Sequence, residues 1–262
     1  MKKKLFIGTN TKMYKSIADT VLFLERLQEL TADISRNEVC LFVIPSFTAL
    51  EKARLVIKNN SIMLGAQNMC WEDQGQFTGE ISPLMLKETG VDIVEIGHSE
   101  RRHVLRETDY EENKKVLAAV RHGFTALLCI GETEEQKHYG IADEVLTMQL
   151  KTGLHGVPEE QIGLCMIAYE PVWAIGVSGK PAGKEYAAEK HLVIKNTLRK
   201  LYGEAGSLVP VLYGGSVHNN NAAELIQMDN IDGLFIGRSA WEADNFNMII
   251  RDVLREFYKK NS

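Results

Sequence analysis

Polar side chains suited to moving a proton stand directly after predicted strands. Asn10 and Lys12 follow the first apolar run, His98 and Glu100 follow the fourth, and Glu170 ends the sixth. A carboxylate can remove a proton, an imidazole can polarise a carbonyl group, and a lysine can stabilise developing negative charge. Singly, each residue has an ordinary explanation as a cap, a helix start or a surface charge. Their joint placement after three strands is what indicates a catalytic pocket.

Glycine-rich turns form a second group of candidate functional residues. Gly214, Gly215 and Ser216 follow the seventh run, and Gly237 follows the eighth. Such turns can present backbone N–H groups to an anion. The loops after strands 7 and 8 often bind phosphate in α/β barrels. An isolated Gly-Gly-Ser is equally well explained as a flexible turn.

Motifs for metals and nucleotide cofactors are missing from the sequence. The seven histidines show no metal-ligand spacing, and no dinucleotide fingerprint follows the first apolar run. The segment from Gly176 to Lys180 lacks the spacing of a phosphate-binding P-loop and is followed by Pro181 where Ser or Thr is required. We therefore expect no metal and no cofactor.

Eight short apolar runs, rich in β-branched residues, alternate with longer amphipathic stretches. They are Leu5–Gly8, Val39–Ile44, Ile62–Ala66, Val91–Ile96, Thr125–Ile130, Leu164–Ala168, Val209–Tyr213 and Leu234–Ile236. Nearly continuous apolar runs are typical of parallel strands that are buried on both faces. The pattern predicts an α/β protein, a single (β/α)8 barrel over residues 1–262. A doubly wound open sheet is the structural alternative.

Helical patterns fill the intervals between these runs. Ile17, Val21, Leu24 and Leu27 have the three-to-four spacing of one buried helix face. Further helices are expected to start at Pro83 and Pro158 and to close the chain over Asn245–Phe257. In a barrel, these helices would surround the strands and leave the strand C-termini to form the active face.

Composition excludes several classes of protein. The 35 acidic and 30 basic residues give a net charge of −5, which argues against binding to nucleic acid. The first apolar run stops at Gly8, too early for a secretory signal, and no run could span a bilayer. The four cysteines lie far apart without a Cys-x-x-Cys pair, as expected of reduced thiols in a cytoplasmic protein.

Six sequence blocks, in order along the chain, resemble the triosephosphate isomerase family. They are Gly8-Thr9-Asn10-Thr11-Lys12-Met13, Gly75-Gln76-Phe77-Thr78-Gly79-Glu80, Gly97-His98-Ser99-Glu100-Arg101-Arg102, Cys129-Ile130-Gly131-Glu132, residues 168–176 and Tyr213-Gly214-Gly215-Ser216-Val217. The resemblance runs from the first strand to the last. It implies a barrel enzyme that isomerises a phosphorylated sugar through an enediolate.

The resemblance also implies a role for each residue that matches a block. Glu170 would be the base, His98 the neutral electrophile, Lys12 the positive charge beside the enediolate, and Asn10 a substrate-binding residue. Further residues would bind the phosphate group, namely Gly176, Ser216 and Gly237. Others would support the site: Ser99, Glu100, Cys129, Gly214 and Gly215.

Two further features follow from the resemblance. The segment from Glu170 to Ala182 would form a lid, with hinges at residues 171–173 and 180–182, whose closure would exclude water. The loop Phe77–Glu80 would project into a neighbouring subunit, so a homodimer is expected.

Three positions depart from the family pattern. Thr11 replaces a tryptophan, the lid tip at residues 176–182 is one residue longer, and Arg238 stands where a second glycine is usual. Arg238 could contact the phosphate or point into solvent. The family's main activity predicts interconversion of dihydroxyacetone phosphate and glyceraldehyde 3-phosphate, as in glycolysis and gluconeogenesis. The lid and Arg238 are similar to a sub-branch that isomerises erythrulose phosphates, which is the alternative.

Overall fold

The computed structural model describes residues 3–59, 61–176, 179 and 181–261 of the chain. Its strands form a closed barrel in the order β1-β2-β3-β4-β5-β6-β7-β8, and every neighbouring pair is parallel. β8 pairs with β1, with Phe6 opposite Gly233, so the sheet has no free edge. The predicted (β/α)8 barrel is confirmed, and the open sheet is not formed. The strands are β1 Leu5–Asn10, β2 Val39–Ile44, β3 Met63–Ala66, β4 Ile93–Ile96, β5 Thr125–Ile130, β6 Cys165–Tyr169, β7 Val211–Tyr213 and β8 Gly233–Ile236.

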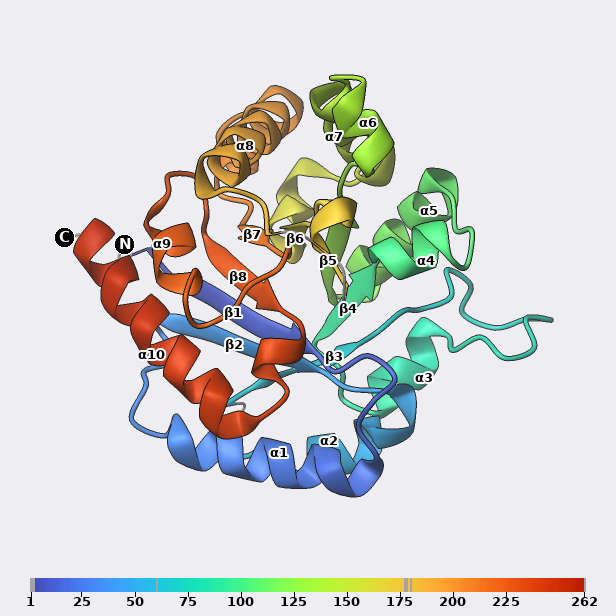
Figure 1. Ribbon diagram of the computed structural model, residues 1–262. Helices are drawn as coiled ribbons and strands as arrows, with labels where there is room; N and C mark the ends of the chain where they lie inside the picture. Colours follow the sequence, from blue (N-terminus) through green and yellow to red (C-terminus); the bar gives the residue numbers. More distant parts are fainter. Residues whose placement is uncertain (1–2, 60, 177–178, 180, 262) are drawn as a thin grey trace.

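Helices lie between successive strands and surround the barrel (Figure 1). The α-helices are α1 Ile17–Leu30, α2 Leu50–Val56, α3 Pro83–Glu88, α4 Ser99–His103, α5 Asp109–Arg121, α6 Glu134–His138, α7 Ala142–Gly153, α8 Lys184–Ser207, α9 Ala222–Gln227 and α10 Ala243–Lys260. Short 3₁₀ helices are η1 Phe47–Ala49, η2 Glu159–Leu164, η3 Val172–Ala174 and η4 Arg238–Ala240. None of the described helices is long and apolar enough to cross a membrane.

Two apolar layers hold the barrel together. The larger layer lies between strands and helices, and the smaller one fills the barrel interior with Phe42, Ile44, Ile93, Leu127, Cys129, Met166, Ala168, Leu212 and Phe235. Gly8 is required inside the barrel, because a Cβ there would lie 2.3 Å from the Phe42 ring. The interior is therefore a packed core beneath the strand C-termini.

All eight predicted strands are found within two residues of their expected limits. β7 begins two residues late because Pro210 accepts a hydrogen bond from Ile167 N but has no N–H to donate. The predicted buried face of α1 is wrong at Ile17, which is 44% exposed. Ile17 begins the helix at its exposed end, and the buried residues are Thr20, Phe23, Leu24 and Leu27. Pro158 starts a 3₁₀ helix rather than an α-helix.

Candidate active site

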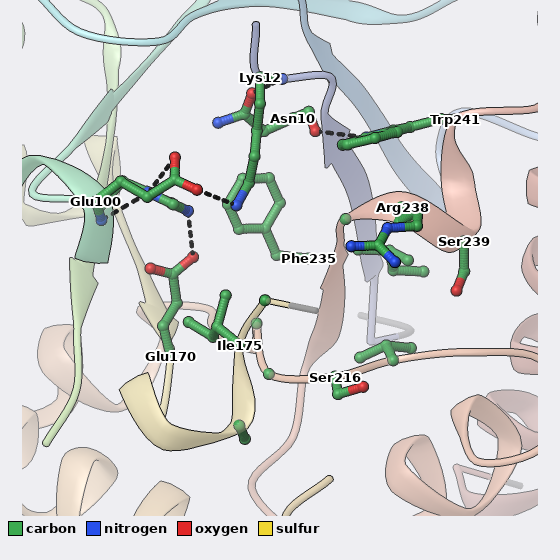
Figure 2. Close-up of a pocket in the computed structure, with 18 of the residues that line it drawn as sticks. Asn10, Lys12, Glu100, Glu170, Ile175, Ser216, Phe235, Arg238, Ser239 and Trp241 are labelled. Atoms are coloured by element: carbon green, nitrogen blue, oxygen red, sulfur yellow. Dashed lines mark hydrogen bonds and ion pairs between the residues drawn. The ribbon is translucent and has the colours of Figure 1, made fainter. Parts of the chain in front are cut away.

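A cavity of about 340 Å³ opens at the C-terminal ends of the strands (Figure 2). Its lining comes from β1 and β8 and from the segments that follow β1, β4, β6, β7 and β8. The lining residues are Asn10, Lys12, Tyr14, His98, Glu100, Glu170, Ala174, Ile175, Gly176, Gly214, Gly215, Ser216, Val217, Phe235, Ile236, Gly237, Arg238, Ser239 and Trp241.

Eleven of the thirteen residues predicted for the site line this one cavity. The other two, Ser99 and Cys129, are buried just behind it. The backbone N–H of Ser99 donates to Glu170 Oε2 at 3.3 Å. The predicted lid tip includes residues 177, 178 and 180, which lie outside the described residues.

Glu170 and His98 face each other across the base of the cavity. Glu170 Oε1 lies 3.6 Å from His98 Nε2, and both side chains are buried. His98 stands immediately before α4, and its Nδ1 accepts the backbone N–H of Glu100 at 3.2 Å. A carboxylate and a ring N–H are thus directed at the same small space.

Two glycines make room for Glu170. A Cβ on Gly131 would lie 1.9 Å from the Glu170 carbonyl oxygen, and a Cβ on Gly214 would lie 2.9 Å from its Cγ. The sequence predicted that glycines after strands form turns that bind an anion. The structure adds that Gly131 and Gly214 permit β5, β6 and β7 to approach closely around the carboxylate.

Lys12 is held in a conformation that non-glycine residues rarely adopt, with φ of +52°. Its backbone N–H donates to Asn10 Oδ1 at 2.6 Å, and Gln67 Nε2 donates to its carbonyl at 2.8 Å. Its ammonium group lies 2.7 Å from Glu100 Oε1. Partial burial raises the pKa of Glu100, but the hydrogen bond from Lys12 and the charges nearby outweigh it, so the net pKa is lowered. Lys12 therefore brings a fixed positive charge to the cavity.

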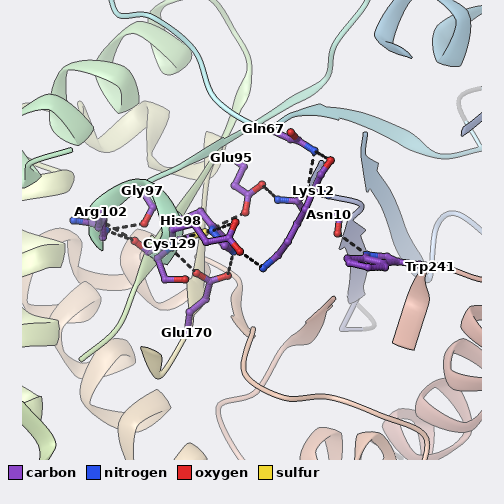
Figure 3. Close-up of polar contacts among 12 residues, drawn as sticks. Asn10, Lys12, Gln67, Glu95, Gly97, His98, Arg102, Cys129, Glu170 and Trp241 are labelled. Atoms are coloured by element: carbon purple, nitrogen blue, oxygen red, sulfur yellow. Dashed lines mark hydrogen bonds and ion pairs between the residues drawn. The ribbon is translucent and has the colours of Figure 1, made fainter. Parts of the chain in front are cut away.

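Glu95 is a buried carboxyl group that sequence reasoning missed. It lies on β4, is fully inaccessible to solvent, and accepts a hydrogen bond from Asn10 Nδ2 at 2.6 Å (Figure 3). Burial, followed by the nearby charge of Glu170, raises its pKa well above the ordinary value. The sequence signal that could have identified it is a charged residue within the apolar run Val91–Ile96.

The opposite side of the cavity can bind an anion. Gly176, Ser216 and Gly237 line the cavity from the segments that follow β6, β7 and β8. Arg238 is directed into the cavity from η4 (Figure 2). The side chain of Arg238 forms no hydrogen bond or ion pair with the described residues. Its guanidinium group is therefore available to a ligand.

The first predicted hinge is anchored by a second buried carboxylate, Glu132. It accepts hydrogen bonds from Trp173 Nε1 at 2.8 Å, from Tyr186 Oη at 2.9 Å and from Tyr169 Oη at 3.1 Å. The Lys137 ammonium lies 3.3 Å from the centroid of the Trp173 ring. These contacts fix the segment that follows Glu170.

Comparison with known proteins identifies the family. The family model described as triosephosphate isomerase matches residues 5–253. The chain belongs to the triosephosphate isomerase family. This isomerase is also similar to a solved structure, the triosephosphate isomerase of Bartonella henselae, with a TM-score of 0.84 and 37% identity over 96% of this chain and 99% of that one.

Relatives with higher sequence identity carry another name. The isomerase is 48% identical to the L-erythrulose-1-phosphate isomerase of Rhizobium etli, over 95% of this chain and 92% of that protein. It is 45% identical to the protein of the same name from Rhizobium meliloti, over 97% and 98% of the two chains. The isomerase is an enzyme of the class that interconverts aldoses and ketoses.

Proposed function

We propose that this isomerase acts on the four-carbon ketose phosphate L-erythrulose 1-phosphate. The observation that supports the proposal is the 44–48% identity to relatives of that name, over 92–98% of their length. The triose phosphate substrate predicted first has support only at the level of the family. Roles in glycolysis and gluconeogenesis, which depend on that substrate, are not part of the proposal.

The four-carbon substrate requires the same chemistry as a triose phosphate. L-erythrulose 1-phosphate is dihydroxyacetone phosphate with a hydroxymethyl group on the carbon farthest from the phosphate. Loss of the C3 proton gives an enediolate that spans C2 and C3. A proton returned to C2 leaves the carbonyl at C3, which gives D-erythrulose 4-phosphate without gain or loss of atoms.

In this proposal Glu170 is the base and His98 moves protons between the two oxygens. The carboxylate removes the proton from C3 and returns it to C2. The Nε2–H of His98, 3.6 Å from Glu170 Oε1, polarises the carbonyl group and stabilises the enediolate. Lys12 adds positive charge, and Asn10 orients the substrate oxygens.

The proposed phosphate site is the opposite side of the cavity. Backbone N–H groups of Gly176, Ser216 and Gly237 surround the anion, and Arg238 adds a charge-assisted hydrogen bond. Among the described residues that line the cavity, Arg238 is the cation without a carboxylate partner, because Lys12 pairs with Glu100. Ser99, Cys129, Gly214 and Gly215 support the site without binding substrate.

Substrate preference tests the proposal. The purified enzyme is assayed with L-erythrulose 1-phosphate, dihydroxyacetone phosphate and glyceraldehyde 3-phosphate. We expect kcat/KM to favour the four-carbon substrate by about a hundredfold, which is within what contacts to one added carbon can supply. Equal or greater kcat/KM on the triose phosphates would overturn the proposal and restore the first prediction.

We also propose that residues 1–262 form one cytoplasmic isomerase domain that pairs as a homodimer. The four cysteines are free and buried, as in a reducing compartment. Large apolar side chains are exposed on the segments that follow β1, β3 and β4, including Met13, Tyr14, Phe77 and Leu105. Exposed apolar groups gathered in this way indicate an interface. Light scattering should give the mass of a dimer, and a monomer at micromolar concentration would overturn this part.

A further inference from the structure

Two segments of the proposed phosphate site follow neighbouring strands of the barrel. The β7 segment, residues 214–221, contains Ser216, and the β8 segment, residues 237–242, contains Gly237 and Arg238. Pairing of β7 with β8 fixes where each segment begins, but not where its remainder lies. The two segments can bind one anion together only if the distance between them is correct. Contacts that join the two segments therefore affect phosphate binding.

Two asparagine side chains join the segments. Asn219, in the β7 segment, donates from Nδ2 to Asn245 Oδ1 at 2.9 Å, and Asn245 donates from Nδ2 to Asn219 Oδ1 at 3.3 Å. Asn245 lies in the first turn of α10, which begins directly after the β8 segment. Each amide is thus both donor and acceptor in a cyclic pair, the asparagine bridge.

The bridge is connected to η4 through Asn245. Asn245 Nδ2 also donates to the Ser239 carbonyl oxygen at 2.6 Å, and Ser239 is the residue after Arg238 in η4. Because a carbonyl oxygen can only accept, this contact sets the orientation of the Asn245 amide and leaves its Oδ1 for Asn219. The backbone that carries Arg238 is thereby connected to the β7 segment.

The other end of the bridge is held close to Ser216. Asn221 Nδ2 donates to the Ser216 carbonyl oxygen at 2.9 Å, and Asn221 Oδ1 accepts the backbone N–H of His218 at 2.8 Å. These two contacts close the turn that contains Asn219. A displacement of Asn219 is therefore transmitted to Ser216.

The surroundings of the bridge favour a role in geometry. Asn219 is exposed and Asn245 is half-buried, and neither is among the described residues that line the cavity. Hydrogen bonds that water can reach contribute little to folding stability, because water replaces the lost partner. A binding site, in contrast, requires its groups to be held within about 0.5 Å of the correct geometry. The bridge can therefore affect phosphate affinity more than stability.

We propose that Asn219 and Asn245 are positioning residues for the phosphate group, because their amide pair holds the β7 and β8 segments at the spacing at which both bind one anion. The inference rests on the phosphate site of the proposed function. It does not depend on the number of carbons in the substrate, because the triose and erythrulose phosphates carry the same phosphate group. Loss of the bridge weakens phosphate binding and leaves proton transfer at Glu170 unchanged.

The experiment measures KM, kcat and the inhibition constant of inorganic phosphate for wild type, N245A, N219A and the double variant. In N245A we expect KM and the inhibition constant to rise about tenfold, as for the loss of one or two neutral hydrogen bonds, with kcat within about twofold of wild type. N219A keeps the contact from Asn245 to Ser239, so both constants should rise about threefold. N247A is the control, because Asn247 lies on the same helix and contacts Arg251 instead.

The double variant distinguishes a bridge from two separate effects. If the amides act as a pair, N219A/N245A should match N245A at about tenfold, whereas independent effects would multiply to about thirtyfold. Multiplied effects, an unchanged inhibition constant in N245A, or a fall in kcat without a rise in KM would overturn the inference. Should N245A fail to fold, N219A decides alone: a threefold rise in the inhibition constant supports the inference and an unchanged constant overturns it.

Arg238→Gln separates failure of this inference from failure of the proposed phosphate site. If Arg238→Gln weakens phosphate inhibition and N245A does not, the phosphate site is supported and only the inference is overturned. If neither variant changes phosphate inhibition, phosphate does not bind at these segments, and the proposed phosphate site fails together with the inference.

Discussion

The imidazole Nδ1 of His98 accepts the backbone N–H of Glu100 at 3.2 Å, which assigns the proton of the ring to Nε2. The Glu100 carboxylate lies 3.5 Å from the same nitrogen, but Lys12 holds that carboxylate at 2.7 Å. His98 is thus a neutral donor whose N–H is directed at the cavity. One backbone contact sets both the tautomer and the orientation of the ring.

Removal of this donor should reduce turnover more than binding. In His98→Asn, we expect kcat to fall by about 10²–10⁴-fold with a small change in KM, because the ring acts on the transition state. Steady-state kinetics measure the effect. His103→Asn, a change at the exposed histidine that ends α4, should behave as wild type. A kcat for His98→Asn within a few fold of wild type would remove His98 from the mechanism.

We expect proton abstraction to require the Glu170 carboxylate and to depend on the length of the Glu170 side chain. Glu170→Gln should reduce kcat by about 10⁴-fold. Glu170→Asp keeps the carboxylate but withdraws it by one methylene, so we expect a loss of about 10²-fold. Exchange of the substrate C3 hydrogen in D₂O, followed by NMR, reports abstraction directly. Normal exchange in Glu170→Gln would show that another group is the base, and Glu160→Gln on η2 is the control.

Arg238 should strengthen substrate binding through the phosphate. Loss of one hydrogen bond to a charged group costs about 1.5–3 kcal/mol, so Arg238→Gln should raise KM by roughly 10- to 100-fold while kcat changes less. Competitive inhibition by inorganic phosphate should weaken to the same extent. Arg255→Gln, at an exposed site on α10, controls for net charge. If KM and the inhibition constant of phosphate are both unchanged in Arg238→Gln, the Arg238 side chain does not contact the phosphate group.

We expect Glu112 to make the free energy of unfolding depend on pH. It is fully buried on α5, and burial, with a smaller contribution from the neighbouring Glu107 carboxyl group, raises its pKa to about 7. The folded state therefore binds this proton more tightly than the unfolded state. The resulting stabilisation is complete below pH 4.5 and is lost as the pH rises through 7.

Replacement by an uncharged isostere tests this prediction. The free energy of unfolding of Glu112→Gln relative to wild type should increase by about 3 kcal/mol between pH 4 and pH 8. Urea denaturation at the two pH values measures it. A difference between variant and wild type that does not change with pH would contradict the assignment.

The sequence predicted the barrel and most of the cavity because parallel strands align their C-terminal ends. Asn10, His98 and Glu170 each stand at the end of an apolar run, so one topology brings them together. Glu95 was missed for a physical reason. Both faces of a barrel strand are buried, so an apolar run does not tell which residues point inward.

Other features depend on three-dimensional approach and have no local signal. The close packing of Gly131 and Gly214 around Glu170 involves three different strands. The three donors to Glu132 come from β6, η3 and α8. The burial of residues at helix ends was also difficult to predict. Ile17 fits the apolar periodicity of α1, but it is the first residue of the helix and its side chain is exposed.

The left-handed backbone at Lys12 lowers the stability of the fold, whereas the activity requires the lysine side chain at this position. A side chain in this region is disfavoured by roughly 1–2 kcal/mol, and glycine is not. Two contacts, from Lys12 N–H to Asn10 and from Gln67 to the Lys12 carbonyl, hold the strain in place. A glycine at position 12 should therefore fold at least as stably as lysine yet abolish turnover. Selection for thermal stability alone would tend to discard this ammonium group, so Lys12 is a position where stability and activity oppose each other.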